Sequence, residues 1–180
     1  DMTRLDANRS REIETPVGGK LDPETFVSCE VGARVRYENF SAGASYYYTF
    51  IEDMIVRAPT GNMIGTLYEV TKKNAGKGFV HGVEVEANWR FHPQLALGGG
   101  FAWIEGLIET YPTSDPEKKK RTLDKMMPAQ AFGSLRWDSP AAWSRKAWAE
   151  ILVRGAGGQY RLSPADRLDT QRIPPGGTPG

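Results

Sequence analysis

An alternation of apolar and polar side chains with a period of two residues constrains this chain more than any other feature. It begins at Val27 and gives Val27, Cys29, Val31, Ala33, Val35 and Tyr37 one parity, and Ser28, Glu30, Gly32, Arg34, Arg36 and Glu38 the other. Successive side chains of a β-strand point to opposite faces, so the pattern predicts a strand with one apolar and one charged face. A helix would scatter the same charges around its circumference.

Further strands are expected where the alternation returns. They cover about residues 40–55, 68–91, 95–103 and 129–137. The stretch 141–162 fits both helical and strand spacing, and we favour a strand from about Lys146. Several of these runs exceed the five or six residues usual in globular proteins, whereas a strand that crosses a membrane at a tilt needs about 9–11.

The predicted connections alternate in length. Short turns are expected at 38–39, 92–94 and 138–142, and long loops at 1–24, 56–66, 112–127 and 163–180, with a short helix at Glu117–Lys119 after Asp115 and Pro116. Outer-membrane β-barrels have this asymmetry, with short periplasmic turns and long extracellular loops. The aromatic residues near the short turns suit the headgroup boundary of a bilayer; they are Tyr37, Phe40, Trp89, Phe91 and Trp137.

Composition removes several other classes. The net charge of +1 argues against a strongly basic nucleic-acid binder, and Cys29 is the only cysteine, so no disulfide framework is possible. No stretch approaches the roughly 18 apolar residues of a membrane-spanning helix. The prediction is an all-β antiparallel meander of about six long strands that forms part of a transmembrane β-barrel in contact with outer-membrane lipid. The alternative is a soluble β-sandwich that binds a ligand without transporting it.

Four charged residues share the polar parity and are candidates to face the lumen of such a barrel. They are Glu30, Arg34, Glu84 and Glu86. Glu84 and Glu86 are two residues apart, about 7 Å, a spacing that two carboxylates acting in glycoside hydrolysis could use. A charged lumen wall is the favoured interpretation, because this architecture requires polar residues on the inner face. We find no catalytic set, so we do not expect an enzyme.

Two other features have two interpretations each. His81 has the apolar parity and could ligate haem iron, but an ordinary histidine at the membrane interface is favoured, since no second histidine is near it. The run Lys118-Lys119-Lys120-Arg121 could attract anionic lipopolysaccharide or an anionic ligand, but a solvated loop is favoured.

One segment brings a family resemblance. The residues Asn74-Ala75-Gly76-Lys77-Gly78, followed by Gly82-Val83-Glu84-Val85-Glu86, resemble the Asn-x-Gly…Gly-Val-Glu-x-Glu strand of TonB-dependent receptors. Upstream, Leu21-Asp22-Pro23-Glu24-Thr25 and Glu30-Val31-Gly32 are similar to that family's strand entry, and Ser45-Tyr46-Tyr47-Tyr48 to the strand between them. Order and spacing agree over about residues 20–110. The tail 172–180 resembles a loop of the branch that includes haem and haemoglobin receptors.

The resemblance implies a barrel of about 22 strands around a plug, which imports iron-siderophore, haem or similar cargo with energy from TonB. Its motif positions here are Asn74, Gly76, Gly82 and Glu84. The plug, the TonB complex and the imported ligand are the implied partners, and no resident cofactor is implied. Residues 1–180 are then expected to be a fragment of one barrel domain, without the plug and the final strands.

Overall fold

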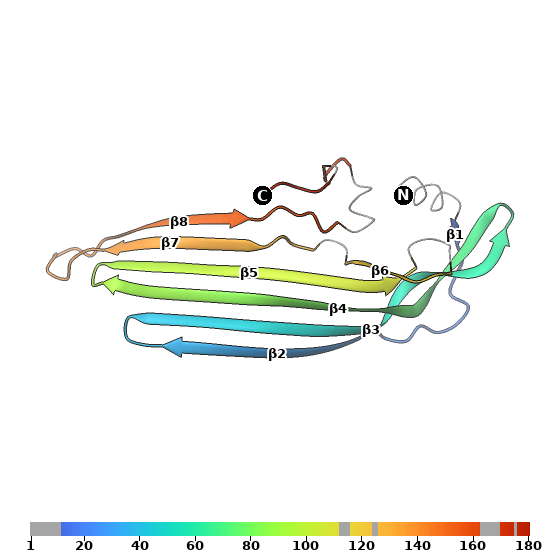
Figure 1. Ribbon diagram of the computed structural model, residues 1–180, viewed down its shortest axis with the longest axis horizontal. Helices are drawn as coiled ribbons and strands as arrows, with labels where there is room; N and C mark the ends of the chain where they lie inside the picture. The colour runs from blue at the N-terminus through green and yellow to red at the C-terminus, as the bar shows by residue number, and fades with distance from the viewer. Residues whose placement is uncertain (1–11, 112–115, 124–125, 163–169, 175) are drawn as a thin grey trace.

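The computed structural model describes residues 12–111, 116–123, 126–162, 170–174 and 176–180, and its long strands lie side by side in one layer (Figure 1). Within these ranges no helix is long and apolar enough to cross a membrane. The path through the sheet follows the sequence: β2 (Thr25–Arg36), β3 (Phe40–Ile64), β4 (Leu67–His92), β5 (Leu95–Thr110), β7 (Gln130–Asp138) and β8 (Trp148–Ala156).

Each strand of this path pairs antiparallel with the next. The predicted all-β meander of about six long strands is confirmed, and the favoured strand after Lys146 is β8. Two short strands are additional. β1 (Glu12–Glu14) pairs parallel with β4, and β6 (Lys119–Thr122) pairs antiparallel with β5.

The register joins residues of like chemistry into rows across the sheet. One row is apolar or glycine throughout: Ala33, Ala44, Val85, Phe101, Ala131 and Gly155. A slip of one residue in any strand would move its apolar side chains to the polar face, so the alternation itself specifies the register.

The apolar face has no protein layer over it. Val31 is 69% exposed, and Ile151 and Val153 on β8 are 69% and 68% exposed. A soluble β-sandwich would bury such a face against a second sheet. The part of the chain that the structure describes contains a single sheet.

Connections differ between the two ends of the sheet. Residues 37–39 and 93–94 make short turns at one end, which we call the short-turn end (Figure 1). The connection between β7 and β8 lies at the same end but spans 139–147, so the turn predicted at 138–142 is longer than expected. Two hydrogen bonds close this connection: the Ser139 backbone N–H donates to the Ala147 carbonyl at 2.8 Å, and the Ser139 hydroxyl accepts the Ala147 backbone N–H at 3.0 Å.

The long loop predicted at 56–66 is wrong, because β3 continues to Ile64 and β4 begins at Leu67. Register shifts after Ile51 and after Pro59 let the hairpin change direction without ending. Gly61 and Gly65 have φ angles of 88° and 63°, which an L side chain rarely adopts. The Pro-Gly signal in the sequence therefore marks a bulge. We call residues 53–76 of this hairpin the arm; it bends away from the sheet in Figure 1.

Two other predicted loops contain strands. The helix expected at Glu117–Lys119 is wrong: Lys119 begins β6, which pairs with Leu107–Thr110. β5 extends beyond its pairing with β7, and β6 occupies the free backbone donors and acceptors there. In the loop expected over 1–24, Glu12–Glu14 pairs with the arm as β1. Asp115 and part of the 163–180 loop lie outside the described residues.

The buried residues gather at the end of the sheet where the arm begins, which we call the long-loop end. The buried hydrophobic side chains are Ile51, Ala58, Val70, Ile108 and Leu162. Elsewhere the single layer leaves both faces open, so packing fixes the arm and its surroundings while backbone pairing fixes the rest.

Candidate functional site

The polar face of the sheet carries a cavity of about 650 Å³. All four charged residues singled out from the sequence line it, together with residues of β5, β7 and β8; the charged and amide side chains of the lining are Glu30, Arg34, Glu84, Glu86, Gln130 and Arg154. A hollow against one sheet requires the sheet to curve toward that side, so this face is concave.

A charged row crosses the floor of this cavity. The register joins Arg34, Gly43, Glu86, Gly100, Phe132 and Arg154. The Arg34 guanidinium lies 3.8 Å from the Glu86 carboxylate, with side chains 72% and 64% exposed. An ion pair this exposed contributes little to stability, so the charges remain free to meet a partner in the cavity.

Gly82, a motif position, makes room for an aromatic ring on the same face. A Cβ at Gly82 would lie 2.5 Å from the Tyr47 hydroxyl oxygen and 2.6 Å from the Trp103 carbonyl oxygen. Tyr47 is the cross-strand partner of Gly82. An aromatic ring over a cross-strand glycine covers backbone that no side chain would otherwise protect.

Asn74 and Gly76 act at the junction of sheet and arm. The Asn74 amide accepts a hydrogen bond from the Asp22 backbone N–H at 2.9 Å and donates to the carbonyls of Asp22 and Asp53 at 2.7 and 2.8 Å. Asp53 has a φ of 54°, rare for a residue other than glycine. A Cβ at Gly76 would lie 2.7 Å from Val56 and 2.9 Å from Met54. The two motif positions Asn74 and Gly76 therefore stabilise the strained bulge of β3 at Asp53.

Glu24 completes this junction. Its carboxylate accepts the backbone N–H of Ile55 at 2.8 Å, just beyond the register shift in β3. The Pro-Glu pair of the strand-entry motif therefore caps a donor that the bulge leaves without a ladder partner.

The opposite, apolar face carries an aromatic cluster near the long-loop end. Tyr48 stacks on Phe79 with ring centroids 5.2 Å apart, and Trp103 packs edge-on to His81 at 5.2 Å. The Tyr46 hydroxyl forms a hydrogen bond of 3.1 Å with His81 Nδ1. His81 therefore lies among rings and faces away from the cavity. Glu105 approaches its Nε2 at 3.9 Å.

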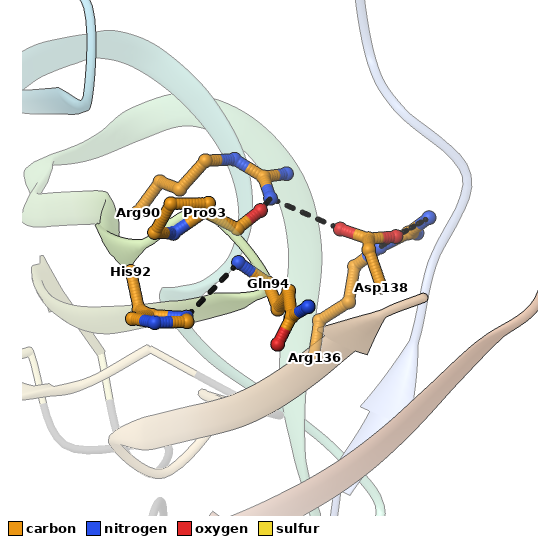
Figure 2. Close-up of polar contacts among 6 residues, drawn as sticks. All are labelled: Arg90, His92, Pro93, Gln94, Arg136 and Asp138. Carbon is orange, nitrogen blue, oxygen red and sulfur yellow. Dashed lines mark hydrogen bonds and ion pairs between the residues drawn. The ribbon is translucent and has the colours of Figure 1, made fainter. Parts of the chain in front are cut away.

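A second polar cluster ties the strands together at the short-turn end (Figure 2). Arg90 donates from Nη1 to Asp138 at 3.1 Å and to the Pro93 carbonyl at 3.2 Å, while Arg136 donates to the other Asp138 oxygen. The Arg136 guanidinium also lies 4.9 Å from the ring centre of Trp148. This cluster joins β4, β7 and β8 at their ends.

The arm has its own ion pairs. Arg57 contacts Glu14 at 3.1 Å and Glu12 at 3.5 Å, so β1 is held to the arm by charge as well as by backbone pairing. The Glu69 carboxylate accepts hydrogen bonds from Thr60 at 2.7 Å and Asn62 at 3.0 Å. These hydrogen bonds, with one from Thr15, hold the pKa of Glu69 below its ordinary value of 4.5.

Sequence reasoning placed the four charges on one face but missed the residues that shape their surroundings. Tyr47 was recognised only as part of an aromatic run, and Arg154 and Gln130 were not singled out. The signal that could have found them is the register, since one row joins Glu86 to Arg154 through two intervening partners that only strand pairing identifies. Within the described residues no group of three or more His, Cys, Asp or Glu could hold a metal ion.

Comparison with known proteins agrees with this architecture. The model of the family "TonB dependent receptor-like, beta-barrel" matches residues 7–178. A pesticin receptor of Yersinia enterocolitica is 32% identical over 127 residues, which is 66% of this chain and 17% of that protein. The pesticin receptor of Yersinia pestis is 32% identical over 126 residues, with the same shares. This chain therefore spans about a sixth of the length of these relatives.

Among solved structures, the copper transporter OprC superposes with a TM-score of 0.57 at 20% sequence identity. The match covers 82% of this chain and 21% of OprC. At this identity the likeness concerns the fold.

Proposed function

Since the chain belongs to the TonB-dependent receptor β-barrel family, we propose that it forms part of the wall of an outer-membrane transporter that takes up a scarce nutrient such as an iron-siderophore or haem. Barrels of this family lie in the Gram-negative outer membrane, and its members are receptors and transporters rather than enzymes. The two-sided sheet supports the proposal most directly: its apolar face is uncovered and its polar face is concave and charged.

The uncovered face fits hydrocarbon. A bilayer supplies no water for backbone groups, so a sheet within it must close into a barrel and present apolar side chains outward. β2 and β8 each have one edge without a partner among the described strands, so in this proposal further strands of the same barrel pair with both. Residues 1–180 are then one stretch of a single barrel domain.

The concave face fits a lumen. In the proposal, Glu30, Arg34, Glu84 and Glu86 face the interior and contact the plug domain implied by the family. Their exposed side chains and the weak pairing of Arg34 with Glu86 support this role, because exposed charges that stabilise one another little can pair with an inserted domain. The motif positions Asn74, Gly76 and Gly82 then serve the wall's geometry, and TonB acts through a segment outside this chain.

The cargo proposal has two sources. Iron-siderophore and haem are what the family resemblance implies, and a structural neighbour is named a copper transporter, so these three are the cargoes to compare. We expect a deletion strain to lose growth on one defined iron or haem source and to recover it with the full-length gene.

Copper uptake is the matched control of that experiment. If the cargo is an iron chelate, the deletion strain grown with limiting copper and replete iron should accumulate as much copper as the parent strain. A deletion strain with normal growth on every iron and haem source and reduced copper accumulation would overturn the iron proposal.

A further inference from the structure

The apolar face contains two aromatic belts at a separation that matches a membrane. One belt lies at the short-turn end and includes Trp89; the other is the cluster around Phe79. Ten residues of β4 separate these two side chains, about 33 Å along the strand. At a tilt of about 40° this becomes roughly 25 Å along the membrane normal, the height of the apolar band of such barrels.

Three lysines lie just beyond the second belt. The register joins Phe79, Leu107 and Thr122 in one row, and Lys77, Glu109 and Lys120 in the row two positions farther toward the long loops. Every second row lies on the same face, so Lys77 and Lys120 lie on the side of the belts, at the level where lipid headgroups begin. The Lys118 ammonium lies 5.5 Å from the centre of the Tyr111 ring, beside them. We call Lys77, Lys118 and Lys120 the lysine patch.

The patch carries a surplus of positive charge. All three lysines are exposed, and within the described residues neither Lys77 nor Lys120 has a carboxylate within 4.0 Å. Among the residues that the structure describes, the acids nearby are Glu109, which lies between them in the row, and Glu117, which is 3.5 Å from Lys119. Below the patch, Glu105 is approached by both Arg161 at 4.0 Å and His81 at 3.9 Å.

We propose that the lysine patch binds the phosphorylated headgroup of the glycolipid of the outer leaflet, a lipid A. Ammonium groups are compact donors that pair with phosphate, and basic clusters beside a membrane-spanning segment attract anionic headgroups. The aromatic belt below supports the same occupant, since Tyr48 and Phe79 offer rings to the sugars and upper acyl chains, while the Trp103 ring is covered by the Arg161 guanidinium at 5.6 Å. The proposal concerns the outer face of the wall and goes beyond transport through its lumen.

The experiment compares lipid A retained by the full-length receptor purified from outer membranes in mild detergent. The triple variant Lys77→Gln, Lys118→Gln, Lys120→Gln should retain several-fold less lipid A by mass spectrometry than the unmodified protein. Lys119→Gln is the matched control, because Lys119 has the opposite parity and pairs with Glu117. A triple Lys→Arg variant should retain lipid A, which separates charge from folding.

Added lipids then identify the bound group. Lipid A with both phosphates should raise the thermal unfolding temperature of the delipidated receptor by several degrees, and dephosphorylated lipid A should not. Equal stabilisation by the dephosphorylated lipid, or by inorganic phosphate alone, would overturn the proposal, as would unchanged lipid retention in the glutamine variant. Growth on iron sources is not part of the readout, so the proposal can fail while transport stands.

Discussion

At the scale of single residues, positions one row apart in the sheet face two different environments. Val85 lies between the two aromatic belts on the apolar face, and Ala102 lies one row away on the concave face, opposite Glu84. The same charged substitution at these two positions should therefore have opposite consequences.

We expect Val85→Arg in the full-length protein to reduce assembly into the outer membrane, at a cost of about 2–4 kcal/mol near the midplane. Ala102→Arg places the same charge in a polar space beside Glu84 and should be tolerated. The abundance of heat-modifiable barrel in outer-membrane fractions measures both. Equal tolerance at the two positions would contradict the assignment of the faces.

Gly82 tests the ring contact on the concave face. Gly82→Ala should destabilise the barrel by about 1–3 kcal/mol, because the added Cβ would overlap Tyr47 and the Trp103 carbonyl. Gly133→Ala is the control, since the nearest atom to its Cβ would be 3.9 Å away. Urea unfolding in detergent or lipid compares the two; equal midpoints would remove the steric explanation.

At the scale of elements, the arm is a continuation of β3 and β4 held at an angle by a few side chains. Asn74→Ala removes three hydrogen bonds at the bulge and should destabilise the arm by about 1–2 kcal/mol. Limited proteolysis of the intact receptor should cut within 53–76 faster in this variant. Asn88→Ala on the same strand is the control, because the Asn88 side chain makes no hydrogen bond among the described contacts. The protease should cut this variant at the same rate as the unmodified receptor.

The arm should also loosen in acid. The folded pKa of Glu69 is lowered, so its contribution to stability is present above the unfolded value of about 4.5 and is lost as pH falls through the folded value. Hydrogen-exchange protection of arm amides, corrected for intrinsic rates, should fall below pH 4.5. Glu69→Gln should remove most of that dependence; an unchanged pH profile in this variant would assign the effect to other groups.

At the scale of the whole molecule, a single sheet with an uncovered apolar face is stable only as part of a closed wall. We expect the full-length protein to fractionate with the outer membrane and to migrate faster on gels before heating than after, because a closed barrel resists detergent. Recovery of the protein in the soluble periplasmic fraction would contradict this expectation.

The sequence by itself determined the six long strands, the two faces and the family, because the period of two is a local property that every long strand repeats; it did not predict the short strands β1 and β6. It placed Glu30, Arg34, Glu84 and Glu86 on one parity. It misread Pro59 and Gly61 as the centre of a loop, since a bulge and a loop use the same residues and differ only in whether the partner strand continues.

Only the tertiary structure decided which residues act together. The hydrogen bonds between Asn74 and Asp22 join positions that are 52 residues apart in the sequence, and the row from Arg34 to Arg154 crosses six strands. Such neighbours are set by the register and by the direction of the arm, which result from pairing along the entire sheet. A local pattern encodes which face a side chain takes, whereas the partner it meets there depends on where the rest of the chain returns.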